Sequence, residues 1–555
     1  MRLIRRSSAA LAALALLAGC PEAPQGPRYV GAGASPRSGG VLNISHETDV
    51  DGLDPQVAYN ELSTMVMRLM FDGLLDYDHN AELIPHLARA LPVVSEDGKT
   101  FTFHLREGVY FHPMEGLPEG RELIAEDVRY TMLRLMSPEL GSPGYGFYNT
   151  IVGAEAYHAG EADDVPGIRV TGPYSISFTL ERRDQTFLNA MAMTFAYPVP
   201  RENVERWGPE VARHPVGTGP NVFERWERGV VIEMRRFDRH FEQRPRPDRV
   251  VFYENLPRGT AAMRFRNGGL DTIHRQSQQD YHFFKNAEAW QPYLDEHPKS
   301  NVWGVGMNTQ VAPLDNVHLR RAIAFALDRE GWDRARADRL SPTGQLVPRN
   351  VWGYAEGIED EHTLNLERAR QEMALAGYAD GYPEPLSFII TEGDVGRIYG
   401  ELVQADLARI GVEVRIRQVA FSTYLSETGT RGRAELFMVG WDMDFPDAAN
   451  FFEPLFHSDA IADTGSQNRA FYSNPALDAI LDQARGVVDR SERRDLYRQA
   501  SRILIDDAPW GFVFSDTLLE VWQPYVRGYR PHPVWPQNYR DAWLDLPRRR
   551  AGAAR

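Results

Sequence analysis

The sequence is almost without cysteine. Cys20 is the single cysteine among 555 residues, which excludes an internal disulfide framework and a cysteine-based zinc site. The histidines form no cluster with metal-ligand spacing, and the sequence has no zinc-peptidase helix, nucleophile elbow or phosphate-binding loop. We therefore expect a protein that is not an enzyme and that uses no metal or other cofactor.

Positive charge is scarce as well. Lys and Arg number 61 against 77 Asp and Glu, which gives a net charge of −16. An acidic balance of this kind repels phosphate backbones, so nucleic acid is excluded as a partner, whereas cationic or zwitterionic ligands suit it. Hydrophobic residues make up 43% and charged residues 25%, which is a globular composition. Because 555 residues exceed what one core organises, at least two lobes are expected.

No apolar run reaches transmembrane length. The nearest is an Ala- and Leu-rich stretch at 9–18, which follows three arginines and leads to Leu17-Ala18-Gly19-Cys20. This pattern looks like a bacterial lipobox. It predicts a lipoprotein signal peptide at 1–19 and a lipid on Cys20 that tethers the protein to a membrane, facing the periplasmic space. An ordinary leader with a chance cysteine is the alternative.

The segments next to the chain ends have the composition of linkers. Residues 20–40 are rich in Pro and Gly and predict a flexible tether, and order is expected to begin with a strand at Val41–Ser45. Residues 546–555 combine arginines with Ala and Gly and predict a frayed basic tail.

The second half of the chain contains the clearest α/β unit. Leu386–Thr391 predicts a strand, an apolar stripe from Ile398 to Ile410 predicts a helix, and Val412–Arg417 alternates as the next strand. A unit of this length favours a right-handed parallel crossover. The apolar run at 436–439 predicts a further buried strand of the same sheet.

The residues after this last strand predict a ligand pocket. Gly440 ends the apolar run, and Trp441, Asp442, Asp444 and Asp447 follow it. Because open α/β sheets bind ligands just past the ends of buried strands, we expect Asp444 to meet a positive group and Trp441 to supply a flat apolar surface. The alternative is a loop whose carboxylates cap a helix or face water.

An aromatic loop at 142–148 has two interpretations. Tyr145, Phe147 and Tyr148 follow Ser142-Pro143-Gly144, and the loop is either a packed turn or a second ligand contact.

Several long motifs occur together in a familiar order. They are Ser95-Glu96-Asp97-Gly98-Lys99-Thr100 with Phe103 to Val109, Ala125-Glu126-Asp127-Val128, Gly217-Thr218-Gly219-Pro220, Ala376-Gly377-Tyr378, Gly440-Trp441 with Asp444 and Asp447, and Tyr472-Ser473-Asn474-Pro475. In these motifs the chain resembles, from about residue 40 to 545, the family 5 extracytoplasmic solute-binding proteins. These are the dipeptide- and oligopeptide-binding components of bacterial ABC importers.

The resemblance implies an α/β, periplasmic-binding-protein-like fold. Two α/β lobes are joined by two crossing segments, as in the large peptide-binding type with an extra subdomain in lobe one. Lobe one is expected at 40–302 together with 516–545, and lobe two at 303–515. The resemblance also assigns Asp444 to the ligand's ammonium and Trp441, Tyr145 and Tyr148 to aromatic contacts. The chain departs from the family pattern at Met443 and Phe445, where Ala and Tyr are usual.

The function implied is capture of small peptides, closure of the lobes, and delivery to ABC permease subunits in the membrane by a monomeric binding protein. A binder of another solute, such as an opine, a sugar or a metal chelate, and a receptor subunit that senses its ligand are the alternatives.

Overall fold

A computed structural model describes residues 26–358, 362–535, 537–545 and 548–549. The predicted signal peptide, the lipid attachment at Cys20 and residues 550–555 of the predicted tail lie outside these ranges. Within them, no helix combines the length and the apolar character that a bilayer crossing needs.

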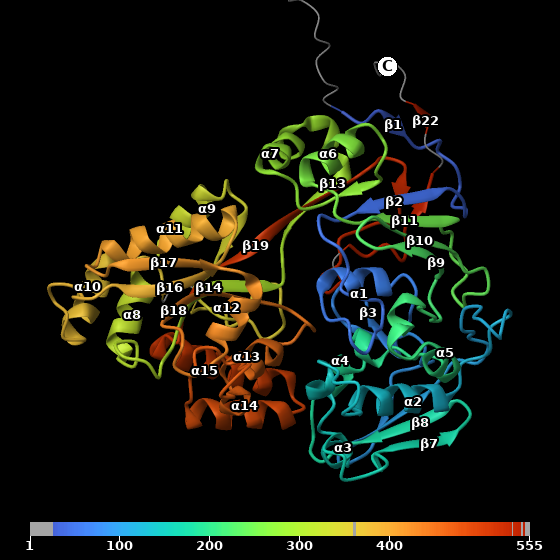
Figure 1. Ribbon diagram of the computed structural model, residues 1–555, viewed down its shortest axis with the longest axis horizontal. Coiled ribbons are helices and arrows are strands. Elements are labelled where there is room, and N and C mark those ends of the chain that lie inside the picture. The colour runs from blue at the N-terminus through green and yellow to red at the C-terminus, as the bar shows by residue number, and fades with distance from the viewer. Residues whose placement is uncertain (1–25, 359–361, 536, 546–547, 550–555) are drawn as a thin grey trace, which may run out of the picture.

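The chain forms two α/β lobes that lie side by side (Figure 1). One connection runs from strand β13 (Leu294–Pro298) into β14 (Asn301–Met307). The other is the long strand β19 (Trp510–Trp522), which pairs with β14 in lobe two and with β13 beside lobe one. The predicted fold class, two α/β lobes joined by two crossing segments, is therefore confirmed.

Lobe one contains two main sheets. The first has the strand order β2-β11-β10-β9, with β2 parallel to β11. The second, of order β5-β6-β8-β7, packs with helix α2 as an extra subdomain at the lower end of the lobe in Figure 1. The strands are β2 Val41–Ser45, β5 Val93–Val94, β6 Thr100–His104, β7 Ile168–Gly172, β8 Ser175–Thr179, β9 Asn221–Glu227, β10 Val231–Arg236 and β11 Arg249–Tyr253. The helices are α1 Glu61–Met67, α2 Ala125–Met136, α3 Ala154–His158, α4 Phe187–Ala190, α5 Arg201–Trp207, α6 Arg258–Arg266 and α7 Gln278–Asn286.

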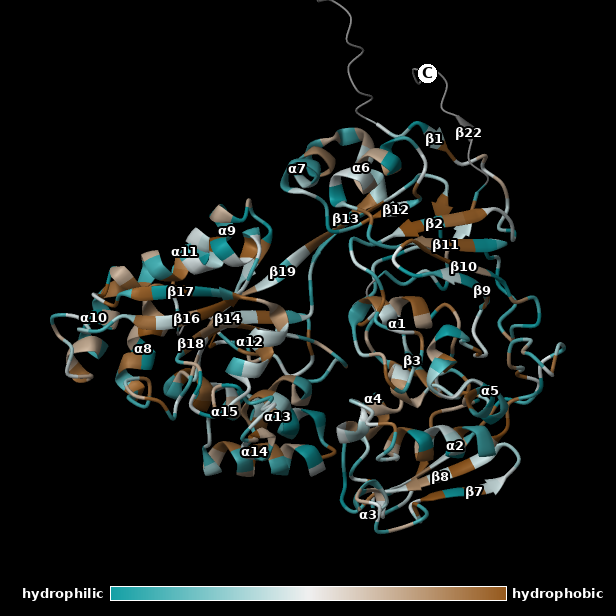
Figure 2. Cartoon of the chain, viewed as in Figure 1, coloured by the Kyte–Doolittle hydropathy of each residue, from teal (hydrophilic) through white to brown (hydrophobic). Residues whose placement is uncertain are grey.

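Alternating side chains explain the second sheet. In β6 the buried Phe101 and Phe103 share one face, and they pair with Phe178 and Ile176 of β8. Polar residues between them point away, which is the pattern of a sheet buried on one side. Figure 2 shows the apolar character of strands such as β2 and β8.

Lobe two is built on a sheet of order β19-β14-β18-β16-β17. Strand β16 (Leu386–Thr391), helix α11 (Asp394–Ala408) and β17 (Val414–Val419) form the predicted parallel crossover, and β18 (Leu436–Asp442) lies parallel to β16 as expected. Helices cover both faces of the sheet. They are α8 Val317–Ala326, α9 Arg329–Ala335, α10 Leu366–Leu375 and α11 on one face, and α12 Phe421–Thr428, α13 Ala449–Phe456, α14 Pro475–Gly486 and α15 Arg490–Asp507 on the other.

The described segments that come first and last in the chain lie together beside lobe one, in regions where a flexible tether and a frayed tail are predicted. Tyr29–Val30 (β1) pairs with Arg548–Arg549 (β22), and the backbone amides of Gly33 and Ala34 donate to the Asp545 carboxylate at 3.0 and 2.9 Å. The Gly-rich composition that suggested flexibility instead lets the backbone approach a carboxylate closely. Residues 29–40 therefore belong to the folded lobe.

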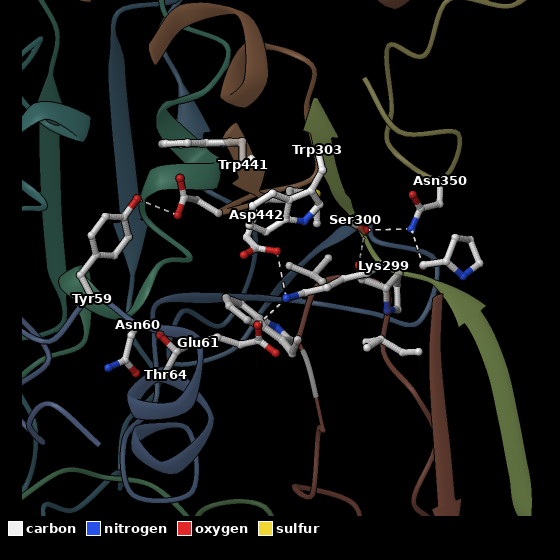
Figure 3. Close-up of a pocket in the computed structure, with 18 of the residues that line it drawn as sticks. Tyr59, Asn60, Glu61, Thr64, Lys299, Ser300, Trp303, Asn350, Trp441 and Asp442 are labelled. Atoms are coloured by element: carbon white, nitrogen blue, oxygen red, sulfur yellow. Dashed lines mark hydrogen bonds and ion pairs between the residues drawn. The ribbon is translucent and has the colours of Figure 1, made fainter. Parts of the chain in front are cut away.

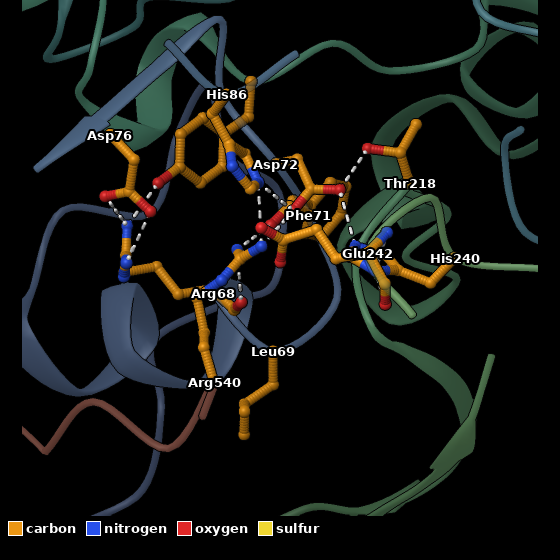
Figure 4. A network of polar contacts seen from close by, with 12 residues as sticks. Arg68, Leu69, Phe71, Asp72, Asp76, His86, Thr218, His240, Glu242 and Arg540 are labelled. Carbon is orange, nitrogen blue, oxygen red and sulfur yellow. Dashed lines mark hydrogen bonds and ion pairs between the residues drawn. The ribbon is translucent and has the colours of Figure 1, made fainter. Parts of the chain in front are cut away.

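A buried network of charges joins distant parts of lobe one (Figure 4). Asp72 accepts from Arg540 at 2.5 Å and from Thr218 at 2.9 Å, and its carboxylate lies 3.0 Å from His86 and 3.4 Å from His240. Burial by itself raises the pKa of Asp72, but Arg540 and the imidazoles outweigh burial and hold the pKa well below its usual range. Asp72, which follows α1, thus joins the segment around Arg540 to the Gly217-Thr218 turn.

Replacing Arg540 is expected to destabilise the protein strongly. In Arg540→Met the Asp72 carboxylate stays buried without its guanidinium, a loss that typically costs about 3–5 kcal/mol. Urea unfolding followed by circular dichroism measures the shift of the lobe-one transition. The control Arg201→Gln breaks an exposed pair with Glu205 and should leave that transition unchanged. Equal transitions for the two variants would contradict a structural role of the network.

Candidate ligand-binding site

A cavity of about 1340 Å³ lies between the lobes. Lobe one lines it with residues around the start of α1 and with 193–195, and lobe two lines it with the ends of β16 and β18 and with α12. The crossing segment at 297–300 lies between the two walls (Figure 3). The cavity therefore opens at the carboxyl ends of parallel strands, where α/β sheets place their ligands.

Asp444 stands at the centre of the polar contacts in this cavity. Strand β18 continues through Trp441 to Asp442, and Asn450 of α13 then holds the following turn. Asn450 accepts from the Asp444 backbone amide at 2.8 Å and donates to the Asp444 carboxylate at 2.9 Å. Tyr59 of lobe one donates its hydroxyl to the other carboxylate oxygen at 2.8 Å. Asp444 thus accepts from both lobes.

The place of Asp444 inside the cleft changes its acidity. Burial raises the pKa of Asp444 to about 6, although the hydrogen bonds from Asn450 and Tyr59 favour the ionised form, and the charge of Asp442 adds to the rise. No cation of the described chain lies within ion-pair distance of Asp444, so its charge is unbalanced until a positive group enters.

A second contact between the lobes runs through Lys299 of the crossing segment. Its ammonium lies 2.5 Å from Glu61 of lobe one and 2.9 Å from Asp442 of lobe two. Burial alone raises the pKa of Glu61, but the charges of Lys299 and Arg275 outweigh burial and hold the pKa below its usual range. The ion pairs therefore hold both walls of the cavity to the crossing in this conformation (Figure 3).

The other crossing strand is tied in by Asp516. Its carboxylate accepts from Asn301 at 2.8 Å and from the Trp303 indole at 3.0 Å, while Asn301 also donates to Asp442 at 3.1 Å. These bonds join β14, β18 and β19 where the chain leaves lobe two, and they fix the Trp303 ring in the cavity wall.

The predicted site residues separate into two groups. Asp444 and Trp441 both line the cavity. Tyr145 and Tyr148 do not, which corrects their expected placement. Tyr148 is fully buried, and its hydroxyl donates to the Ala190 carbonyl at 2.7 Å, while Tyr145 stacks on His158 with ring centroids 3.7 Å apart. Both tyrosines pack in the extra subdomain, so the packed-turn interpretation of the loop fits them.

The aromatic loop nevertheless meets lobe two through another side chain. Phe147 packs edge-on against Phe445 with centroids 6.3 Å apart, and Phe445 is buried in the lobe-one core although it follows β18. Met443 packs against the same core. Met443 and Phe445, the two positions at which the chain departs from the family pattern, therefore make contacts between the lobes.

Sequence reasoning missed Tyr59, Glu61, Lys299 and Asn450. Each is a polar residue far in sequence from the predicted pocket or on its flanking helix, and none forms part of a motif. A weak signal was present at Asn60, which caps the start of the buried helix α1. Tyr59 directly precedes this cap and therefore lies at the boundary of that helix.

The cavity offers recognition groups rather than reactive ones. It combines carboxylates with Trp303, Trp441 and other aromatic rings, and the described residues contain no cluster of His, Cys, Asp or Glu suited to a metal ion. Two lobes that enclose such a cavity, with the chain crossing twice, define the class of two-lobed solute-binding proteins.

Comparison with known proteins gives the family. Residues 82–463 match the family model described as bacterial extracellular solute-binding proteins, family 5 Middle, and the chain belongs to this family. The dipeptide-binding protein of Escherichia coli (strain K12) is 27% identical over 518 residues, covering 91% of this chain and 95% of the relative. Heme-binding protein A of Haemophilus influenzae is 28% identical over 488 residues, covering 86% of both chains.

A solved structure agrees with this assignment. The ABC transporter-associated periplasmic binding protein DppA from Helicobacter pylori, in complex with the peptide STSA, is 25% identical with a TM-score of 0.77 and covers 92% of this chain and 99% of its own. The resemblance inferred from the motifs is confirmed, and the chain is a binding protein of the ABC-importer type rather than an enzyme.

In the closed arrangement described above, and without a bound cation, we expect Asp444 to take up a proton near pH 6. Carbon-13 NMR of labelled aspartate carboxyls measures the midpoint, and Asp444→Asn identifies the signal by its loss. Tyr59→Phe removes a hydrogen bond that favours the ionised form, so it should move the midpoint upward. A midpoint near 4 in that closed arrangement, the ordinary value for aspartate, would contradict the environment described for this carboxylate.

Proposed function

We propose that the protein captures small peptides outside the cytoplasmic membrane and delivers them to the permease of an ABC importer. The observation that carries the proposal is Asp444, an unbalanced carboxylate beside Trp441 in the interlobe cavity. A peptide's ammonium supplies the missing charge, and the aromatic wall accepts side chains of different shapes. The names of the relatives, a dipeptide-binding protein and a peptide complex among them, support this ligand class.

The size of the cavity supports a ligand longer than one amino acid. Sites for small molecules typically measure about 300–1000 Å³, whereas this cavity holds about 1340 Å³. Backbone contacts to an extended peptide add affinity without reading its sequence. A micromolar constant corresponds to about −8 kcal/mol, and one charge-assisted hydrogen bond contributes about 1.5–3 kcal/mol, so the ammonium contact is one anchor among several.

The proposed cycle is a conformational one. The protein opens between the crossing segments, a peptide enters, and the ion pairs of Lys299 and the Tyr59 contact re-form around it. The closed monomer then docks on the permease. A lipid on Cys20 keeps the protein on the membrane that holds its partner.

The native solute is identified by mass spectrometry of ligand released from purified protein. Released peptides support the proposal. Released non-peptide solute would favour the alternative that the name of the heme-binding relative suggests, and a chemically altered ligand would contradict a carrier role.

Loss of the Asp444 charge is expected to weaken peptide binding at least tenfold. Removing one partner of a buried ion pair typically costs about 3–5 kcal/mol. The loss of binding free energy is smaller here, because water hydrates the separated charges in the open cleft. Calorimetry with di- to penta-alanine compares wild type with Asp444→Asn. Wild-type affinity should fall about tenfold per pH unit below the pKa of Asp444 in the ligand-free protein, because the carboxylate must then lose a proton to bind the ammonium, and the variant should show no such slope. Unchanged affinity in the variant would remove Asp444 from the site.

Ligand binding is expected to contract the protein. Small-angle scattering should give a smaller radius of gyration at saturating tetra-alanine, with a curve that matches the structure in which Phe445 packs on Phe147. Asp444→Asn at the same peptide concentration serves as the control. An unchanged radius at saturation argues against closure around the ligand.

A further inference from the structure

The paired strands β13 and β19 turn one face toward the cavity. Asp295 of β13 lies directly opposite Glu520 of β19, and His297 lies opposite Leu518. Because side chains alternate along a strand, these four residues share one face, and all four line the cavity. Leu519, between two of them on β19, points to the other face and into a hydrophobic core. The two strands therefore form a part of the cavity surface that is distinct from the lobe-two wall.

Glu520 is a buried carboxylate on this face. Only 2% of its surface is exposed, yet the residue lines the cavity. The Tyr529 hydroxyl donates to one carboxylate oxygen, Oε2, whereas Oε1 has neither a hydrogen-bond donor nor a cation among the described residues. Burial is the largest influence on the pKa of Glu520 and raises it, as expected for a carboxylate that has lost water without gaining a positive partner.

The cavity as a whole carries more negative than positive side chains. Among the described residues that line it, the carboxylates of Glu61, Asp295, Asp442, Asp444 and Glu520 face only Lys299, Arg469 and Arg530 as lysine and arginine partners. Lys299 is already shared between two of these carboxylates, and His297 lies 2.9 Å from Asp295. A ligand can therefore place more than one positive group in the cavity.

An aromatic ring flanks Glu520. Trp522 follows two residues later on the same face of β19 and also lines the cavity. Its ring packs edge-on against Tyr529 with centroids 5.6 Å apart, and Tyr529 stacks on Tyr539 at 5.1 Å. Long basic side chains lay their apolar stems along such surfaces while the charged end reaches a carboxylate. Leu518, on the other side of Glu520, adds apolar surface.

Glu520 is well separated from the proposed ammonium contact at Asp444. Asp295, which lies opposite Glu520, precedes Lys299 in the crossing segment, and the Lys299 ammonium lies 2.9 Å from Asp442, just before Asp444. At about 3.3 Å per residue, the four steps from Asp295 to Lys299 span about 13 Å. An extended peptide advances by a similar length per residue. A side chain beyond its first residue can therefore reach Glu520 while its terminal ammonium stays at Asp444.

We propose that Glu520 binds the cationic side chain of a lysine or arginine residue within the ligand, with its stem along Trp522. The ammonium or guanidinium donates to Oε1 and supplies the positive charge that the carboxylate lacks. Asp295 adds a second, weaker attraction, because its side chain is 49% exposed and screened by water. This inference rests on the proposed function, since it assumes that peptides enter the cavity, and it names basic peptides as the ligand class.

The test compares a charged with an uncharged side chain of similar stem. Calorimetry measures the binding of tetra-alanine and of its variants with lysine or norleucine at the second, third or fourth position. At one position or more, we expect wild type to bind the lysine peptide at least tenfold more tightly than the norleucine peptide. Glu520→Gln should bind both with the affinity of the norleucine peptide. Glutamine still accepts the Tyr529 hydrogen bond, so the local structure is kept. Asp295→Asn should keep part of the preference.

Glu296→Gln is the matched control. Glu296 is the neighbour of Asp295 on β13, but it points to the opposite face, where Tyr281 and Lys285 donate to its carboxylate. The substitution removes the same charge as Glu520→Gln and should keep the full lysine preference. Equal loss of the preference in both variants would assign it to the net charge of the protein and overturn the inference.

The same measurements separate this inference from the proposed function. If wild type binds tetra-alanine but prefers lysine at none of the three positions, or if Glu520→Gln keeps the preference, the inference is overturned and peptide binding stands. A merely structural Glu520 would lower the affinities for lysine and norleucine peptides alike and leave their ratio unchanged, which also overturns it. A wild type that binds none of these peptides overturns the proposed function, and the inference with it.

Discussion

The cleft depends on a carboxylate that has no counterion of its own. Asp444 accepts hydrogen bonds from Asn450 in lobe two and from Tyr59 in lobe one, and its pKa is raised to about 6 by burial. Hydrogen bonds keep the side chain in place, but they do not neutralise it. A positive group that enters the cavity therefore gains more at this point than it would in water, where both charges are hydrated. The surrounding structure serves to hold this carboxylate in a partly dry space.

The crossing segment places a second set of charges between the lobes. Lys299 sits between Glu61 and Asp442, so one ammonium bridges both walls, and opening the cleft must return at least one of these groups to water. Apolar packing adds to the closed form, since Phe445 leaves lobe two to pack against Phe147. Charge and packing thus favour the same closed arrangement, and in the proposed cycle a ligand adds to this stabilisation.

Local patterns predicted much of the fold. The apolar alternation of β6, the crossover from β16 to β17 and the buried run of β18 were all readable from the chain because each depends on a few neighbouring residues. The predictions failed where a residue's placement depends on a partner that is distant in the sequence. The sequence predicted a tether at Gly33 and Ala34 because their partner, Asp545, lies more than 500 residues away. It predicted ligand contacts for Tyr145 and Tyr148, but Tyr145 stacks on His158 and the Tyr148 hydroxyl donates to the Ala190 carbonyl.

The sequence by itself determined the class of protein, the two-lobed fold and the wall of the cavity that carries Trp441 and Asp444, because these follow from periodicity and from motifs within short segments. Only the tertiary structure decided what faces that wall. Tyr59, Glu61 and Lys299 come from segments more than a hundred residues away, and no local rule places them there. The charge balance of a site between two lobes depends on both lobes together. Whether a carboxylate or a cation of one lobe is neutralised depends on which groups of the other lobe lie within a few ångströms of it.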